Sequence, residues 1–211
     1  MSTYILTSLF PNGFNNEVAH VLKREILKSD SFTYVASDFN DYEVTDFYFK
    51  LVVGLFSDIG INFKTINCVD DRTKTDVAQQ KVATADVVWL AGGDTVKQIK
   101  SIEKYGLDKI IREHTGVVLG MSAGSINLSK FAVCCPEYDR PETVVYNGIG
   151  CVDVTVWPHF KPDDIDADAI EISKKHVIYG LQNEDIIVCK DDNVEFVGDI
   201  YKITNGVVEQ I

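Results

Sequence analysis

The sequence is poor in positive charge. Its 211 residues include 20 lysines and arginines against 32 aspartates and glutamates, which gives a formal net charge of −12 at pH 7. Because binding to phosphate groups depends on clustered lysine and arginine, this balance argues against nucleic acid and anionic membranes as partners. It does not decide the charge of a substrate, since a local pocket can oppose the charge of the whole molecule.

Cysteine pairs with CxxC spacing are also lacking. The five cysteines form an odd-numbered set: Cys68, Cys134, Cys135, Cys151 and Cys189. Zinc sites and disulfide frameworks have characteristic spacings, and this set shows neither, so we expect reduced thiols and no bound metal. The N-terminal segment MSTYILTSLF has no basic region, and its apolar run is too short for a signal peptide or a membrane span. A cytoplasmic protein is therefore the expected case.

Short apolar runs alternate with amphipathic stretches through the first 120 residues. The pattern predicts strands within residues 3–9, 32–37, 62–67, 85–93 and 116–120, with helices at 15–29, 41–60 and 94–114 and a polar helical stretch before residue 85. Strands that are almost continuously apolar are buried on both faces, as in parallel sheets. This rhythm predicts an α/β fold with a doubly wound, mostly parallel sheet and helices on both faces.

The second half of the sequence is less regular. Residues 134–150 resemble a loop or irregular hairpin, residues 151–158 are strand-like, and residues 160–176 contain a short acidic helix. After them, short apolar runs alternate with turn residues, so we expect small antiparallel strands near the C-terminus to complete the sheet. No repeat or linker interrupts the chain, and its length suits one domain, which we expect to span residues 1–211.

Residues 118–125 read VLGMSAGS, so that an apolar run ends in a serine placed between Gly120 and Gly124. A nucleophilic hydroxyl at a strand end needs a sharp strand-to-helix turn, whose crowded backbone requires small flanking residues. Ser122 meets this requirement, and the positive end of a following helix would favour negative charge beside it. The alternative is a tight turn without a catalytic role.

Two further segments carry residues suited to catalysis. LAGGDT (90–95) follows an expected strand, and the N–H groups of Gly92 and Gly93 could form an oxyanion hole. The alternative is a helix entry with Asp94 or Thr95 as N-cap. WPHF (157–160) places His159 at the end of an apolar strand, unlike the other histidines, His20, His114 and His176. A structural role is the alternative for this histidine too.

In combination, the GG turn, the GxSAG turn and the PHF segment resemble the peptidase E family of serine peptidases. That family includes the aspartyl dipeptidases and, more distantly, the cyanophycinases. The resemblance covers most of the chain and includes the order of the motifs. It implies a fold like that of the class I glutamine amidotransferases, with serine where those enzymes carry cysteine. It also implies a peptidase that hydrolyses dipeptides or short peptides, without a metal or organic cofactor.

Carried over by position, the resemblance gives four residues a role. Ser122 matches the nucleophile and His159 the general base, whereas Gly93 and the N–H of Ala123 match the oxyanion donors. In chemical terms, His159 would take the proton of Ser122 during attack and return it to the leaving amine.

The sequence departs from the family at the third member of the triad. Members of the family carry an acid in a GLPEG-like turn, but here the turn reads GLQNED and places Asn183 where the carboxylate belongs. Glu184 is one residue away and would reach His159 in a remodelled turn. Asparagine can also orient an imidazole, but without a carboxylate the imidazolium is less stabilised, which predicts a slower enzyme.

A second departure concerns the substrate. The aspartyl dipeptidases are rich in arginine after the PHF segment, whereas this chain has none there, which leaves a preference for N-terminal aspartate open. Lys161 and Arg140 are the nearest basic candidates, Asp139 matches a family acid near the site, and Asp94 is a further candidate at the GG turn. The carboxylates at 163–168 are more typical of a solvated face.

Two alternative functions remain at this point. Asn183 favours a binding or regulatory protein that keeps the fold with an impaired triad. An amidase or esterase acting on non-peptide substrates would use the same nucleophile. The sequence does not distinguish a monomer from a homodimer.

Overall fold

A computed structural model describes residues 2–136 and 142–211. Its central sheet has seven strands in the order β11-β10-β1-β5-β4-β2-β3. The five parallel strands are β1 (Thr3–Thr7), β2 (Ser31–Val35), β3 (Thr65–Val69), β4 (Val87–Leu90) and β5 (Val117–Met121). At one edge β10 (Ile186–Lys190) runs antiparallel to β1, and β11 (Asn193–Val197) runs antiparallel to β10.

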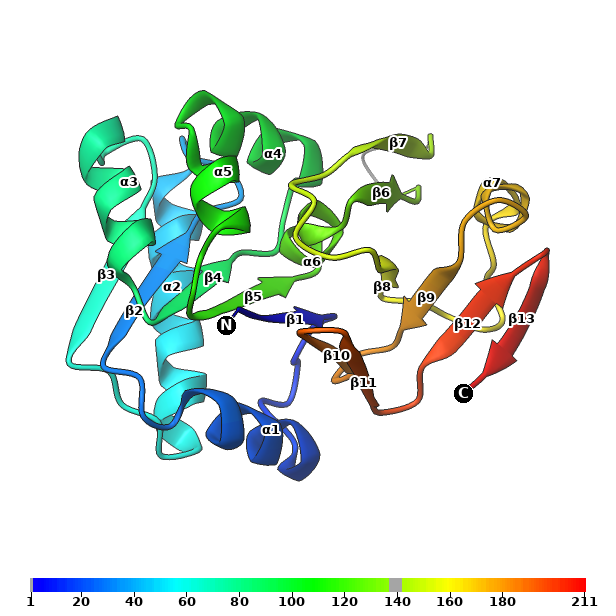
Figure 1. The fold of residues 1–211 in the computed structure, drawn as a ribbon, viewed down its shortest axis with the longest axis horizontal. Helices are drawn as coiled ribbons and strands as arrows, with labels where there is room; N and C mark the ends of the chain where they lie inside the picture. Colours follow the sequence, from blue (N-terminus) through cyan, green and yellow to red (C-terminus); the bar gives the residue numbers. More distant parts are fainter. Residues whose placement is uncertain (1, 137–141) are drawn as a thin grey trace.

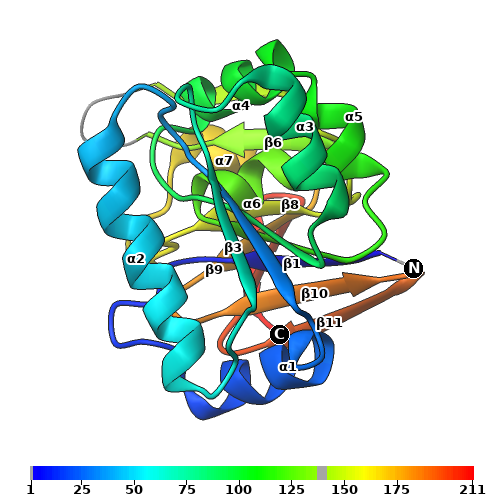
Figure 2. The same ribbon diagram turned by 90° about the vertical axis from the view of Figure 1, so that its left-hand side faces the viewer.

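Helices cover both faces of this sheet, as Figures 1 and 2 show. One face carries α1 (Asn16–Ile26) and α2 (Tyr42–Asp58), and the other carries α3 (Thr75–Thr84), α4 (Thr95–Lys104), α5 (Leu107–Arg112) and α6 (Ala123–Leu128). Every residue of β1, β4 and β5 is buried, which explains why these strands are almost continuously apolar in sequence. The expected doubly wound, mostly parallel α/β fold is confirmed.

The helix expected over residues 94–114 is divided in two. Gly106 has φ 64°, in the left-handed region, and the chain changes direction there between α4 and α5. Glycine adopts this conformation at little steric cost, so the break is local to one residue and does not disturb the amphipathic pattern on either side.

The C-terminal strands complete the central sheet only in part. Besides β10 and β11, the second half forms a separate four-stranded sheet of order β13-β12-β9-β8. Its strands are β8 (Thr155–Pro158), β9 (Ile178–Leu181), β12 (Tyr201–Thr204) and β13 (Val207–Gln210), and β8 and β9 are parallel. These strands and α7 (Ala167–Ile172) enclose a small core of their own around Phe160, Ile178 and Ile203. This second core is separate from the core of the main sheet.

The segment expected to be a loop or irregular hairpin lies between and around two short paired strands, one just before it and one within it. β6 (Phe131–Cys134) pairs antiparallel with β7 (Val144–Asn147). Among the described residues, no helix combines the length and apolar character needed to cross a membrane.

The carboxyl ends of β1, β4 and β5 lie side by side at one edge of the central sheet. The chain leaves β1 toward α1 on one face and leaves β5 toward α6 on the other, so the winding reverses between these neighbours (Figure 1). In open α/β sheets, ligands bind in the crevice at such a switch point. This edge is therefore where the fold favours a site.

Candidate active site

Ser122 sits on the turn between β5 and α6. Its backbone has φ 50° and ψ −106°, a conformation that is strained for a residue other than glycine. The N–H of Ser122 donates a hydrogen bond of 2.9 Å to the carbonyl oxygen of Thr7. This is the backbone strain expected of a nucleophile on a strand-to-helix turn.

The two flanking glycines are required by close backbone contacts. A Cβ atom on Gly120 would lie 2.5 Å from the carbonyl carbon of Gly124, and one on Gly124 would lie 2.3 Å from the carbonyl oxygen of Leu90. These separations are far below van der Waals contact. The sharp turn at Ser122 therefore depends on both residues lacking a side chain.

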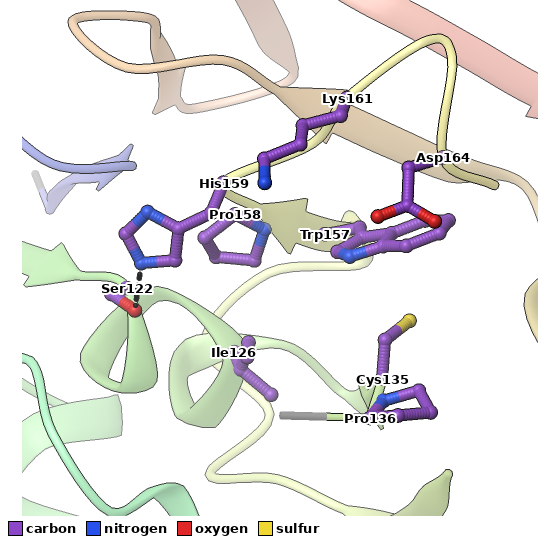
Figure 3. Close-up of a pocket in the computed structure, with 9 residues that line it drawn as sticks. All are labelled: Ser122, Ile126, Cys135, Pro136, Trp157, Pro158, His159, Lys161 and Asp164. Atoms are coloured by element: carbon purple, nitrogen blue, oxygen red, sulfur yellow. Dashed lines mark hydrogen bonds between the residues drawn. The ribbon is translucent and has the colours of Figure 1, made fainter. Parts of the chain in front are cut away.

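His159 approaches Ser122 from the second sheet. It follows β8 with φ 59°, and its Nε2 atom lies 2.8 Å from Ser122 Oγ (Figure 3). The Ser122 side chain is half-buried, whereas His159 is exposed. With the proton on Nδ1, the imidazole is placed to accept the hydroxyl proton of Ser122 through Nε2.

The other ring nitrogen of His159 faces two neutral oxygens. Nδ1 is 3.5 Å from Asn183 Oδ1 and 3.5 Å from the Oγ atom of Ser8. Glu184 is not bonded to the ring: its carboxylate instead accepts a hydrogen bond of 3.1 Å from Asn12 Nδ2. The structure thus brings Ser122, His159 and Asn183 together and pairs Glu184 with Asn12.

The GG turn lies directly beside Ser122. A Cβ atom on Gly92 would be 3.5 Å from Ser122 Cβ. Gly93 has φ 132°, and a Cβ atom there would be 2.3 Å from Ser37 Oγ. Ala123 begins α6, where the first N–H groups of a helix have no partner within the helix. These positions suit N–H donors to an oxyanion near Ser122.

A cavity of about 220 Å³ opens next to the serine and histidine (Figure 3). Ile126 and the Trp157 indole give it apolar walls, and the side chains of Lys161 and Asp164 reach over it. The full lining is Ser122, Ile126, Cys135, Pro136, Trp157, Pro158, His159, Lys161 and Asp164. Asp164 comes from the acidic segment expected to be a solvated face; it is exposed to solvent and also lines the cavity.

Asp94, another expected substrate contact, lies elsewhere. The Asp94 side chain caps α4, where it accepts a hydrogen bond of 2.9 Å from the N–H of Lys97, and it does not line the cavity. This is the N-cap alternative, because the carboxylate satisfies a free N–H of the first helical turn. Asp139 and Arg140 lie outside the described residues.

Two buried amides hold the turns of the site together, and no sequence motif identifies them. Gln98 donates to the carbonyl oxygens of Ala36 and Ala91 at 3.3 and 2.8 Å. Asn127 donates to the side-chain oxygen of Gln98 at 3.0 Å and to the carbonyl of Thr95 at 3.0 Å. This network fixes α4, which follows the GG turn, against α6, which follows Ser122.

Two further residues of the site were missed from the sequence. Ser8 follows β1 at the same edge as Ser122, and the edge rule for parallel strands would have found it. Asp185 lies in the β9–β10 turn, where its buried carboxylate accepts hydrogen bonds from the N–H groups of Gln182 and Asp199 at 2.7 and 3.0 Å. Burial raises the pKa of Asp185 to about 6. In the sequence, Asp185 follows Glu184 in a polar turn, so the sequence gives no sign that its carboxylate is buried.

The described residues contain no group of three or more His, Cys, Asp or Glu side chains arranged to hold a metal ion. Cys68, Cys151 and Cys189 are free thiols. Burial raises the pKa of Cys189 to about 11 and those of Cys68 and Cys151 to about 12, so these thiols are not activated nucleophiles.

Comparison with known proteins gives a family and related folds. Residues 16–197 match the model of peptidase family S51. No curated protein sequence matches the chain significantly. A peptidase from an acI-B1 actinobacterium has 16% sequence identity and a TM-score of 0.72, over 100% of this chain and 94% of that one. A candidate peptidase E protein from Listeria monocytogenes EGD-e has 17% identity and a TM-score of 0.69, over 93% of this chain and 98% of that one.

At these identities the two structures show that the fold is shared. The family match is independent of them and spans most of the chain. This chain therefore belongs to peptidase family S51, the peptidase E family of serine peptidases.

Proposed function

We propose that this serine peptidase hydrolyses dipeptides or short peptides through an acyl-enzyme on Ser122, with His159 as the general base. The observation that carries the proposal is the separation of 2.8 Å between Ser122 Oγ and His159 Nε2, at a strained turn. A nucleophile and its base within hydrogen-bond reach are the signature of covalent catalysis by serine.

In the first half-reaction, His159 takes the hydroxyl proton as Ser122 Oγ attacks the substrate carbonyl carbon. The N–H groups of Ala123 and of Gly93, with Gly92 beside it, would hold the oxyanion of the tetrahedral intermediate, each donor contributing roughly 10²–10³ in rate. His159 then gives its proton to the leaving amine as the C–N bond breaks. In the second half-reaction, His159 activates a water molecule that releases the acyl group from Ser122.

The cavity supports a small substrate with charged groups. Its volume of about 220 Å³ is modest. On the same side of it, Lys161 places an ammonium near Pro158 and Asp164 places a carboxylate over the Trp157 ring (Figure 3). A free α-ammonium would bind at Asp164, and a substrate carboxylate would bind at Lys161. A dipeptide carries both groups within a short distance, which favours it over a long chain.

A pooled dipeptide library tests the proposal. Wild-type protein, Ser122→Ala and the remote surface control Ser57→Ala are incubated with the library, and released amino acids are identified by mass spectrometry. We expect wild type and Ser57→Ala to release amino acids, and Ser122→Ala to lose this activity by about 10³-fold or more. The first residues of the cleaved dipeptides then give the preference for the N-terminal residue of the substrate.

Two outcomes would contradict the proposal. Equal release by Ser122→Ala would place the chemistry elsewhere. Absence of release by wild type, together with hydrolysis of esters or amides that lack an α-amino group, would show an esterase or amidase on the same nucleophile.

A further inference from the structure

Three consecutive residues at the end of β1 hold the separate parts of the active site. The carbonyl of Thr7 accepts the N–H of Ser122 at 2.9 Å, and the carbonyl of Leu9 accepts the N–H of Glu184, next to Asn183, at 2.8 Å. Between them, the hydroxyl oxygen of Ser8 accepts the backbone N–H of His159 at 2.9 Å. Residues 7–9 are thus a common anchor for the nucleophile, the base and the turn behind the base.

Ser8 differs from its two neighbours because it acts through its side chain. The residue is fully buried, with no exposed surface, and its own N–H donates to the carbonyl of Asp185 at 3.3 Å. Its Oγ atom lies 3.5 Å from Nδ1 of the His159 ring, the same distance as Asn183 Oδ1. The imidazole therefore faces two neutral oxygens from different elements, one from the end of β1 and one from the β9–β10 turn.

We propose that Ser8 is a positioning residue for catalysis, whose hydroxyl oxygen shares with Asn183 the task of accepting the Nδ1–H of His159 in place of a carboxylate. This inference rests on the proposed function of Ser122 and His159. Two weak acceptors on Nδ1–H keep the proton on that nitrogen and leave Nε2 free to take the proton of Ser122. They also lower the energy of the imidazolium that forms during attack, although neither carries a full charge.

Ser8 is suited to this role by its remaining hydrogen-bonding capacity. A hydroxyl oxygen has two lone pairs, and one of them accepts the backbone N–H of His159, which leaves the other for Nδ1–H. The same oxygen therefore holds both the backbone and the ring of the histidine. If Ser8 instead donated its proton to Nδ1, the proton of the neutral ring would lie on Nε2 and oppose base catalysis. Removing the hydroxyl should therefore lower kcat in the first arrangement and raise it in the second.

The test compares Ser8→Ala with Ser8→Thr, which keeps a hydroxyl, and with Ser2→Ala at the opposite end of β1 as the control. For a dipeptide cleaved by wild type, we expect Ser8→Ala to lower kcat by about tenfold with KM changed by less than about twofold. Ser8→Thr should retain activity within about threefold of wild type, and Ser2→Ala should match wild type.

The pH profile and a double-mutant cycle separate ring positioning from a purely structural role. Among the described charged groups, Lys161 and Asp164 line the same cavity as the ring, and Glu184 and Asp185 follow Asn183 in its turn. All four are kept in the variants. Loss of an acceptor destabilises the imidazolium, so the acid limb of kcat/KM should move to lower pH in Ser8→Ala. When Asn183→Asp supplies a carboxylate, the loss caused by Ser8→Ala should shrink to about twofold.

Several results would overturn the proposal. An equal loss with and without Asn183→Asp would show that Ser8 only holds the backbone, and a gain in kcat on Ser8→Ala would show that it donates to Nδ1. The ¹⁵N chemical shifts of the His159 ring give a reading that needs no turnover: Ser8→Ala should reduce the fraction protonated at Nδ1, and an unchanged fraction would contradict the proposal. If wild type shows no turnover that depends on Ser122, this result counts instead against the proposed function.

Discussion

Backbone strain is concentrated at the residues that form the site. Among the described residues other than glycine, positive φ angles occur at Ser122 (50°), His159 (59°), Glu184 (70°), Asp191 (53°) and Asn205 (52°). The last two lie in the turns that link β10 to β11 and β12 to β13, where Asp and Asn tolerate this conformation. The first three are the proposed nucleophile, the proposed base and a residue of the turn carrying Asn183. Such strain persists only where the surrounding structure imposes it, and here it fixes the relative directions of two side chains.

Replacing Asn183 by aspartate should make the enzyme faster. The Oδ1 atom of Asn183 already lies 3.5 Å from Nδ1, so Asn183→Asp would place a negative charge beside the imidazolium that forms during attack. We expect kcat/KM to rise by about tenfold and its acid limb to move to higher pH. Steady-state kinetics on a dipeptide across the pH range measures both effects.

The matched control for this change is Gln182→Glu, which adds the same charge to the same turn one residue earlier. It should leave kcat/KM within about twofold of wild type, because Gln182 does not contact the ring and donates instead to the carbonyl of Asp199. An equal gain in both variants would mean that the net charge of the turn, not the contact with Nδ1, controls the rate.

Among the helices and strands, the turn at Ser122 depends on the close packing of α6 against β4. The Cα of Gly124 approaches the carbonyl oxygen of Leu90 so closely that a Cβ atom would lie 2.3 Å from it. Backbone cannot yield as the end of a side chain can, so a methyl group there must push α6 away from the sheet. Ser122, at the start of α6, would move with it.

Gly124→Ala should therefore destabilise the protein by about 2–3 kcal/mol and abolish peptidase activity. Gly54→Ala is the control, since Gly54 lies within α2 and a Cβ atom there would have no neighbour within 4 Å. That change should stabilise the protein by about 0.5–1 kcal/mol, because alanine is the better helix former. Urea unfolding gives both values. Similar urea midpoints of unfolding for the two variants would show that the close approach of Gly124 to Leu90 does not constrain the turn at Ser122.

The parts of the fold set by local pattern were predictable from the sequence, and those set by distant packing were not. The apolar strands and the glycines around Ser122 follow from rules that act over a few residues. The break at Gly106 depends on a single φ angle, and an isolated glycine within a helical pattern does not reveal it. Likewise, the contact between Ser8 and His159 joins residues 151 positions apart, and only the tertiary fold decides it.

At the scale of the whole molecule, the site is shared between the two sheets. Ser122 follows β5 of the central sheet, His159 follows β8 of the second sheet, and Asn183 lies in the turn that links β9 to β10 and thus joins the sheets (Figure 1). The distance between nucleophile and base therefore depends on how the sheets are held together. The anchor at residues 7–9 and the buried carboxylate of Asp185 both act at this junction.

Two buried groups at opposite ends of the central sheet give its stability opposite dependences on pH. At the end remote from the site, burial lowers the pKa of His114, and this effect outweighs the opposite effect of the neighbouring Asp86. At the site, burial raises the pKa of Asp185 to about 6 from its usual value of 3.8. Stability changes with pH wherever the folded and unfolded states bind different numbers of protons.

The signs follow from which state takes the proton. As pH falls through about 6.5, the unfolded chain protonates His114 before the folded chain does, so stability from this residue is lost toward acid. Between pH 3.8 and about 6, only the folded state holds the proton of Asp185, so its contribution is present at low pH and is lost as pH rises through about 6.

Urea unfolding from about pH 5 to about pH 8 tests both, with exposed His20→Gln as the control. The free energy of unfolding of wild type should exceed that of His114→Gln by a margin that grows as pH rises. The margin over Asp185→Asn should shrink as pH rises. If the free energies of unfolding of wild type and His114→Gln change with pH in parallel, His114 is solvated in the folded state. A growing advantage over Asp185→Asn would mean that the two N–H bonds to its carboxylate outweigh burial.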